Sequence, residues 1–364
     1  MVRSALVRHV SPAAQTAIAG RTRTSWARPR PFLPTPTGSI LRTASSLPHN
    51  ATFARRRRLP WVLSSITAAI VGFYTTALVI QARRPCQDPN ASDLSKQKDV
   101  SARYDETADS FDSEVGVSET LMGITRMRKR LAGLCTGHVL EVSCGTGRNL
   151  GYYDISKQSS IESLTFVDLS QQMVDVCKKK WEILFGDAVK DHGSNIKPTF
   201  VSRFLTASAL DAMPPPPSKQ KYDTIIQTMG LCSTPSPIEL VANMIRHLDT
   251  SNPEARILLL EHGRSHRDWL NNILDNAAEK HAEIHGCWFN RDIGALVREG
   301  ARQSGLQLAS EERHHFGTTW IFELRPSPEL VARSRPSQAN ESGREQEQKQ
   351  PLAAGWRSWL GFGG

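Results

Sequence analysis

The sequence predicts an α/β domain, built as a parallel sheet with helices on both faces and preceded by one membrane-spanning helix. Two observations predict this. Short apolar runs alternate with longer amphipathic stretches between residues 101 and 326, and strands that alternate with helices favour parallel pairing. The segment 59–82 has no charged residue, and about 20 apolar residues suffice to cross a bilayer as a helix.

The charge distribution argues against a nucleic-acid partner. The chain of 364 residues has a net charge of +9, but thirteen of its 45 basic residues are arginines within residues 1–87, which contain no acid. The remainder carries 32 basic and 36 acidic residues, the wrong average sign for a nucleic-acid footprint. The six cysteines are scattered without C-x-x-C spacing, which argues against a zinc finger or a disulfide scaffold.

The N-terminal region is typical of a mitochondrial presequence. Residues 1–58 are rich in Arg, Ser, Thr, Ala and Pro and contain no acid, which is the composition of a transit peptide. A basic disordered tail without a targeting role is the alternative.

The apolar segment 59–82 predicts a single membrane span. Trp61 lies near one edge, and arginines flank both ends. Positive charge is heavier before the span than after it, so the positive-inside rule favours the N-terminal side in the matrix and the large domain in the intermembrane space. We therefore predict a single-pass protein of the mitochondrial inner membrane. A buried core helix is the alternative.

Two polar stretches border the predicted domain of residues 101–326. Residues 83–100 are predicted to form a linker. Residues 327–364 are low in apolar content and rich in Pro, Ser, Gln and Glu, which predicts a disordered tail.

Within the domain, the pattern predicts each element in order. Strands are expected at 138–142, 164–168, 199–205, 222–229 and 256–261, helices at 170–185, 237–248 and 291–303, and a closing pair of strands at 306–312 and 318–324. Ligands of such sheets bind beyond the carboxyl ends of the strands.

A glycine turn and an acid mark the predicted binding site. Gly145 and Gly147 follow the first strand and open a helix, and glycine lets the backbone turn sharply and approach a ligand. The spacing matches neither the dinucleotide fingerprint nor a phosphate loop, so we expect a nucleoside without a pyrophosphate cradle. Asp168 ends the second strand, where a carboxylate can accept hydrogen bonds from a ribose diol. A bare turn and a strand-ending cap are the alternatives.

Several motifs resemble one family. The segment VLEVSCGTGRNL (139–150) looks like motif I of class I S-adenosylmethionine-dependent methyltransferases, and FVDLSQQMV (166–174) looks like their acidic-loop motif. Residues 103–115 and 261–293 are similar to quinone C-methyltransferases and type-7 methyltransferase-like proteins. With its N-terminal region, the chain resembles fungal methyltransferases of the mitochondrial inner membrane.

The resemblance implies a Rossmann-like, seven-stranded class I methyltransferase sheet with S-adenosylmethionine as cofactor. It also implies a set of cofactor-binding residues: Glu141, Ser143, Gly145 and Gly147 beside the methionine, Asp168 at the ribose, Leu169 and Met173 at the adenine, Ala209 and Leu210 along its edge, and Gln227 at the floor. Tyr104 and Asp105 would lie on a covering helix. Two positions depart from the family pattern, since Ser143 stands where the motif has glycine and Ala209 where many relatives have an acid.

A catalytic base is needed only if the acceptor carries a proton. His262, after the fifth strand, is the predicted catalytic residue, because a histidine poised near neutrality suits general-base work. Glu261, His266, His281 and His285 are further candidates, and surface or capping roles are the alternative for all of them. We expect no metal site, because His281 and His285 lack a third ligand.

Two functions compete at this stage. The first is an active methyltransferase on the inner mitochondrial membrane that acts on a lipid-soluble small molecule, such as a quinone precursor, or on a protein. The second is a methyltransferase fold kept as an assembly or binding factor for respiratory complexes, with little or no catalysis.

Overall fold

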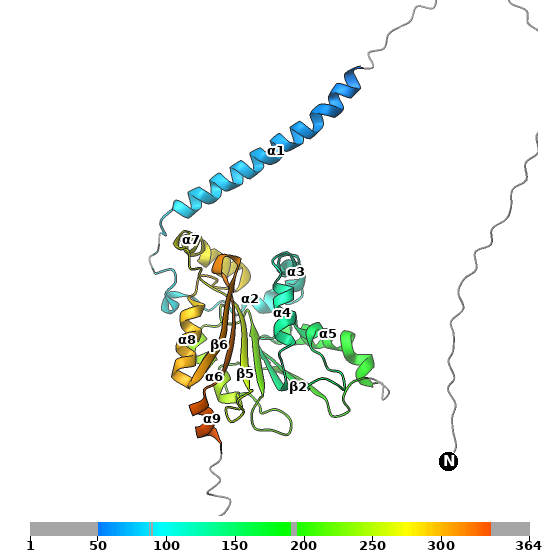
Figure 1. The fold of residues 1–364 in the computed structure, drawn as a ribbon, viewed down its shortest axis with the longest axis vertical. Coiled ribbons are helices and arrows are strands. Elements are labelled where there is room, and N and C mark those ends of the chain that lie inside the picture. The colour runs from blue at the N-terminus through cyan, green and yellow to red at the C-terminus, as the bar shows by residue number, and fades with distance from the viewer. Residues whose placement is uncertain (1–49, 87, 89, 191–194, 336–364) are drawn as a thin grey trace, which may run out of the picture. The chain divides into compact units, whose positions relative to one another are not determined.

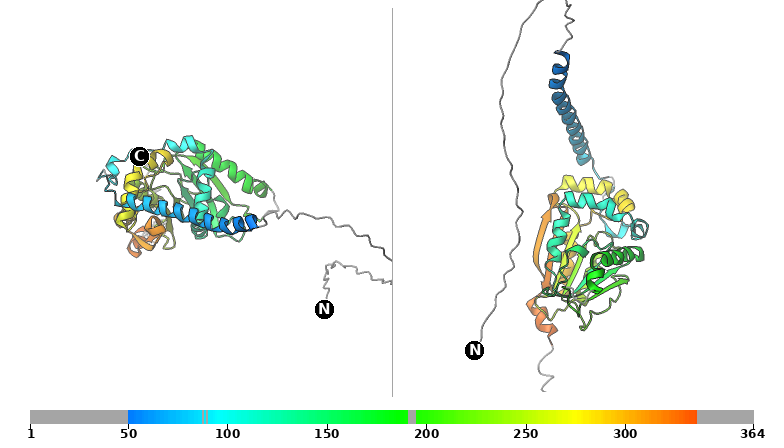
Figure 2. Two further views of the ribbon diagram at one scale, coloured as in Figure 1. Left: turned by 90° about the horizontal axis from the view of Figure 1, so that it is seen from above. Right: turned by 90° about the vertical axis from the view of Figure 1, so that its right-hand side faces the viewer.

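The computed structural model describes residues 50–86, 88, 90–190 and 195–335. Most of the predicted presequence and of the predicted C-terminal tail lies outside these residues. The described elements are shown in Figures 1 and 2.

The helix α1 (Asn50–Arg83) contains the predicted span. Its stretch Leu59–Arg83 has 25 residues, and the most apolar window within it has a mean hydropathy of 1.8 and no buried residue. By length and composition it can cross a membrane. The hydroxyls of Thr75 and Thr76 donate to the carbonyls of Val71 and Gly72, at 2.9 and 2.8 Å, so these polar groups are satisfied within the helix.

The described part of the domain carries a seven-stranded sheet with strand order β3-β2-β1-β4-β5-β7-β6. The strands are β1 (Gly137–Val142), β2 (Ile161–Asp168), β3 (Val201–Thr206), β4 (Thr224–Thr228), β5 (Arg256–His262), β6 (Leu306–His314) and β7 (Thr319–Pro326). The helices are α2 (Arg103–Thr107), α3 (Phe111–Leu121), α4 (Ile124–Ala132), α5 (Gln171–Lys190), α6 (Pro237–His247), α7 (Asp268–His285), α8 (Ile293–Ser304) and α9 (Pro328–Ser334), with the 3-10 helices η1 (Leu94–Lys96), η2 (Leu150–Tyr152) and η3 (His315–Gly317).

Two apolar cores lie on opposite faces of the sheet. Successive strand side chains point to opposite faces, so Ile225 of β4 joins one core while Ile226 joins the other. The first core contains side chains of α6 and α8, and the second contains those of α4 and α5. Both faces are covered, which explains why the central strands are apolar throughout.

The expected strands form, but the sheet is not parallel throughout. Strands β1 to β5 pair in parallel, whereas β7 pairs antiparallel with both β5 and β6. The short η3 turn explains the direction of β7 relative to β6, because only antiparallel neighbours can be joined without a crossover. The helix expected directly after the glycine turn is a single 3-10 turn, η2.

The segment predicted as a linker is fixed to the domain over its second half. The carbonyls of Ala91 and Lys98 accept hydrogen bonds from Asn290 Nδ2 (2.8 Å) and Trp288 Nε1 (3.0 Å). Gln97 Oε1 accepts a 2.7 Å hydrogen bond from Nε of the buried Arg291. At the other end, the described start of the predicted tail forms α9.

Gly147 provides a test of how the glycine turn packs against the core. Its φ is +75°, and an added Cβ would lie 2.6 Å from Leu150 Cδ1 and 2.7 Å from Cys177 Sγ, both buried. We expect Gly147→Ala to lower the free energy of unfolding by about 2 to 5 kcal/mol, from left-handed strain together with overpacking. Urea unfolding measures the change.

Gly145→Ala is the matched control. Gly145 has a φ of +54°, but nothing lies within 4 Å of an added Cβ. It should cost only the strain, about 1 to 2 kcal/mol. Equal losses in the two variants would contradict the packing assigned to Gly147.

Candidate functional site

A cavity of about 460 Å³ lies at the carboxyl ends of the parallel strands. Its walls come from the glycine turn after β1, the end of β2, and the loops after β3 and β4, with α2, α3 and α7 adding side chains from above. In Figure 1, α3 and α7 lie at this end of the sheet. Such a position is where open α/β sheets bind their ligands.

Asp168 and the glycine turn form one wall together. The amide of Gly145 donates to Asp168 Oδ2 at 2.8 Å, and the amide of Ser170 donates to Oδ1 at 3.0 Å. Burial raises the pKa of Asp168 above its usual value. A carboxylate has about four acceptor positions, so Asp168, which lines the cavity, keeps acceptor capacity beyond the amides of Gly145 and Ser170.

Ser143 holds the turn differently from a glycine. Its φ is +53°, a left-handed conformation that is uncommon for a residue with a Cβ. Gln227 Nε2 donates to Ser143 Oγ at 3.1 Å, so the hydroxyl is tied to β4. Ser143 lines the cavity, whereas Gln227 is fully buried and lies outside the lining.

Glu141 and Gly147 support the turn from the core side. The buried carboxylate of Glu141 accepts hydrogen bonds from Asn149 Nδ2 (2.9 Å) and the Tyr153 hydroxyl (2.6 Å), and burial raises its pKa to about 7. Glu141 and Gly147 are absent from the cavity lining, so any effect they have on a ligand is indirect.

Apolar side chains also line the cavity. All four residues predicted to surround an adenine line the cavity: Leu169, Met173, Ala209 and Leu210. Leu169 is 59% exposed although it is large and apolar, while Met173 is buried. An exposed leucine at a cavity edge offers a surface on which a flat ring can rest. The hydroxyl of Ser208 accepts a hydrogen bond from the amide of Leu210, at 3.1 Å.

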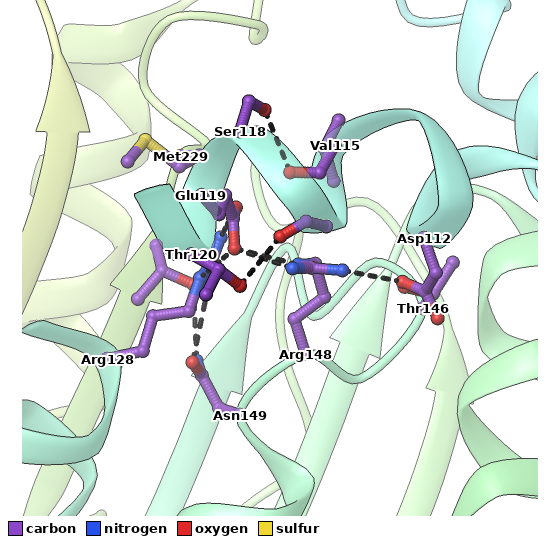
Figure 3. A network of polar contacts seen from close by, with 12 residues as sticks. Asp112, Val115, Ser118, Glu119, Thr120, Arg128, Thr146, Arg148, Asn149 and Met229 are labelled. Atoms are coloured by element: carbon purple, nitrogen blue, oxygen red, sulfur yellow. Dashed lines mark hydrogen bonds and ion pairs between the residues drawn. The ribbon is translucent and has the colours of Figure 1, made fainter. Parts of the chain in front are cut away.

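A buried ionic network, which the sequence analysis missed, fixes α3 over the turn (Figure 3). Glu119 of α3 pairs with Arg128 at 2.8 Å and with Arg148 at 2.7 Å. Asp112 accepts hydrogen bonds from Thr146 Oγ1 (2.7 Å) and Arg148 Nη1 (3.1 Å). Burial alone would raise the pKa of Glu119, but the two guanidinium groups lower it overall.

One signal in the sequence could have revealed part of this network. Arg128 follows Ile124 by four residues and precedes Leu131 by three, so it lies on the buried face of α4. An arginine at such a position needs a carboxylate. The helical spacing of Arg128 does not identify Glu119 as the carboxylate that pairs with it.

The histidine candidates divide into two groups. His262, His281 and His285 line the cavity, whereas His266 and Glu261 do not. Burial lowers the pKa of His262 to about 4, and burial together with His285 lowers that of His281 to about 4. The expectation of a residue poised near neutrality is wrong for His262, because its site is shielded from water and the charged form is disfavoured.

Glu261 has a structural partner instead. Its buried carboxylate accepts hydrogen bonds from the amides of Gly230 and Leu231, at 3.0 and 3.1 Å.

Tyr104 of α2 lines the cavity, and its hydroxyl lies 2.7 Å from Ser233 Oγ, while Asp105 lies outside the lining. Within the described residues, no group of three His, Cys, Asp or Glu side chains is placed to hold a metal ion.

The loop after β4 is braced by Arg291. This buried guanidinium donates from Nη1 to the carbonyls of Leu231 (2.6 Å) and Thr234 (2.7 Å), and from Nε to Gln97. Burial lowers its pKa. The cavity floor is therefore connected through Arg291 to the segment that follows α1.

Sheet order, glycine turn and strand-ending acid are those of a methyltransferase, and the comparison with known proteins agrees. The chain belongs to the methyltransferase domain family, whose model matches residues 121–308, and S-adenosylmethionine is the cofactor of this domain. It is 36% identical over 237 residues to the mitochondrial methyltransferase OMS1 of Saccharomyces cerevisiae. That match covers 62% of this chain and 46% of the relative, so the chain spans less than half of that protein's length.

Solved structures with a similar fold are more distant. An O-methyltransferase of neocarzinostatin biosynthesis, in complex with S-adenosylmethionine and a naphthoic acid, has a TM-score of 0.40 and 17% identity, covering 61% of this chain and 58% of that chain. Magnesium protoporphyrin IX methyltransferase from Synechocystis PCC 6803 has a TM-score of 0.33 and 15% identity, covering 71% and 96%. The family and the fungal mitochondrial relative expected from the sequence are confirmed.

The raised pKa of Glu141 makes stability depend on pH. The folded pKa of about 7 exceeds the unfolded value of 4.5, so the folded chain retains a proton that the unfolded chain releases. Stability from this group is complete below pH 4.5 and is lost as the pH rises toward 7. We expect the free energy of unfolding of Glu141→Gln to rise by about 2 to 3 kcal/mol relative to that of the wild type as the pH increases from 5 to 8.

Urea unfolding at four pH values measures this difference. Glu182→Gln, at an exposed position of α5, is the control and should follow the wild type at every pH. A constant gap between Glu141→Gln and the wild type would show that Glu141 does not titrate in this window.

Proposed function

We propose that this protein is a membrane-anchored mitochondrial methyltransferase that transfers a methyl group from S-adenosylmethionine to a small, lipid-soluble acceptor. The observation that carries the proposal is one cavity of about 460 Å³ that is lined both by the glycine turn with Asp168 and by apolar side chains. We call the part of this cavity lined by Phe111, Val115, Ile124 and Ile284 the acceptor chamber. The mitochondrial relative and the apolar helix Leu59–Arg83 support the location. The inner membrane, with the domain in the intermembrane space, is our proposal from charge asymmetry alone.

The polar wall fits the cofactor. A Cβ at Gly145 would enter open space, so the bare backbone leaves room for the methionine part. The Asp168 carboxylate lines the cavity and can accept hydrogen bonds from the ribose hydroxyls, and Leu169 with Met173 offers an apolar rest for the adenine. When bound, S-adenosylmethionine supplies an activated methyl group with its own leaving group, so the protein mainly has to align the acceptor.

The acceptor chamber favours an uncharged molecule. Phe111, Val115, Ile124 and Ile284 are among its lining residues. Its two lining arginines are already neutralised by carboxylates in the network of Glu119. An anionic acceptor would have to break a buried ion pair, which costs several kcal/mol.

His262 and His281 suit an acceptor with an acidic proton. Both are neutral at physiological pH, because burial holds their pKa near 4. A neutral imidazole can accept a proton, but at this pKa it does so only from a strongly acidified group.

Cofactor binding tests the polar wall. We expect the wild type to bind S-adenosylmethionine in isothermal titration and Asp168→Ala to bind about 100-fold more weakly, because two hydrogen bonds to a charged group are lost. Asp175→Ala, at an exposed site on α5, is the control. Thermal melting of both variants shows whether the fold is retained. A wild type that binds no cofactor would favour the assembly-factor alternative.

The acceptor is identified in cells. Lipid and metabolite profiling of a deletion strain should reveal an apolar compound that lacks one methyl group. The wild-type gene should restore it and Asp168→Ala should not. If Asp168→Ala also restores the compound, the protein acts without binding the cofactor through Asp168, and the assembly-factor alternative is favoured.

A further inference from the structure

Large apolar side chains surround the cavity end of the domain and are exposed. They come from the end of α3, the start of α7 and the η3 turn. Their exposed fractions are 70% for Val117, 83% for Leu121, 43% for Met122, 45% for Trp269 and 70% for Phe316. We call these five residues the apolar rim. A group of this size on one edge marks an interaction surface more often than chance scatter.

Hydrogen bonds join the three segments of the rim. His315 Nε2 lies 2.8 Å from the carbonyl of Met122, which holds η3 against the end of α3. The Ser265 hydroxyl donates to the carbonyl of Phe316 at 2.5 Å, only four residues before Trp269. These bonds hold the η3 turn against the end of α3 and against the segment just before α7.

The backbone at Phe316 is strained so that its ring is exposed. Its φ is +57°, which costs an ordinary side chain about 1 kcal/mol or more. A glycine there would relieve the strain, and the adjacent Gly317 also has a positive φ. A contact outside the domain would explain why a large apolar ring is exposed on a strained turn.

The rim also borders the cavity mouth. Met122 belongs both to the rim and to the cavity lining, and α7 contributes Ile284, which is 43% exposed and lines the cavity. Whatever covers the rim therefore covers the entrance to the acceptor chamber.

The chain connection brings the membrane within reach of the rim. Arg83 ends the apolar helix, and Ala91 is already bound to Asn290. The eight intervening steps span at most about 28 Å when fully extended. The carbonyl of Arg84 also accepts a 3.4 Å hydrogen bond from Asn276 of α7, about 10 Å along that helix from Trp269.

We propose that the apolar rim lies in the interfacial layer of the bilayer in which α1 is anchored, so that the acceptor chamber opens toward the lipid. This inference rests on the proposed membrane anchoring. Leucine, phenylalanine and tryptophan are the residues that enter this layer, and tryptophan prefers the headgroup level. A lipid-soluble acceptor then enters the chamber from the membrane without crossing water.

The experiment uses the full chain with a fluorophore at a single cysteine. Of the native cysteines, Cys135, Cys144, Cys177, Cys232 and Cys287 are buried, so Cys86→Ser provides the background. Leu121→Cys reports on the rim. Ile183→Cys on α5 is the matched control, because it is apolar and also 83% exposed. Val71→Cys reports on the proposed span.

Each labelled chain is reconstituted in phosphatidylcholine vesicles with and without brominated acyl chains. We expect bromine to quench the labels at 71 and 121 at least about twofold and to leave the label at 183 unchanged, because quenching requires contact with the acyl region. Quenching at 71 with none at 121 would overturn the docking and leave the anchoring intact. No quenching at 71 would overturn the anchoring itself.

A second measurement separates lipid from protein on the rim. Aqueous iodide should quench the label at 121 in detergent-free vesicles far less than the label at 183. If iodide fails to reach position 121 while bromine also leaves it unquenched, another copy of the chain covers the rim, and the membrane proposal is wrong.

Discussion

The hydrogen bond from the Gly145 amide to the Asp168 carboxylate joins the carboxyl ends of β1 and β2. Ser143, Gly145 and Gly147 of this turn all have left-handed backbones, which costs free energy at Ser143, because it carries a Cβ. The carboxylate compensates for part of that strain by accepting two amides at once. The same carboxylate lines the cavity. One side chain thus shapes the turn and forms part of the cavity wall.

The position of α3 over the cavity depends on buried ion pairs. Glu119 bridges two arginines, one on α4 and one beside the glycine turn. Removing one partner from such a buried set leaves an uncompensated charge, which costs far more than a surface ion pair. The network of Glu119, Arg128 and Arg148 therefore fixes where α3 lies over the cavity.

Much of the fold could be predicted because it follows from local pattern. Apolar runs such as RILLLE are strands buried on both faces, and the glycine turn followed by Asp168 marked the ligand end. The pairing direction of β7 could not be predicted, because it depends on contacts between segments that are distant in sequence. The pairing of β7 between β5 and β6 is decided by a short turn, and a run of β-formers does not show its neighbours.

Part of the cavity lining could also be predicted from the sequence. Leu169, Met173, Ala209 and Leu210 line the cavity as expected, because they follow strands whose ends meet there. Glu141 and Gln227 lie behind the wall, since strand direction alone does not say which face a side chain takes. The pKa of His262 depends on burial by segments distant in sequence, so its residue type suggested a different proton affinity from the one its surroundings impose.

The bond between Gln97 and Arg291 has a practical meaning for anyone who shortens this chain. A fragment that starts at residue 101 includes the whole sheet and every element of the recognised fold, yet it lacks the amide oxygen that accepts from Arg291 Nε. The freed donor is buried beside the loop that carries Leu231 and Thr234. A crystallisation fragment cut at the apparent domain edge would therefore fold with a loosened floor, and weak turnover by it would reflect the cut and not the native enzyme.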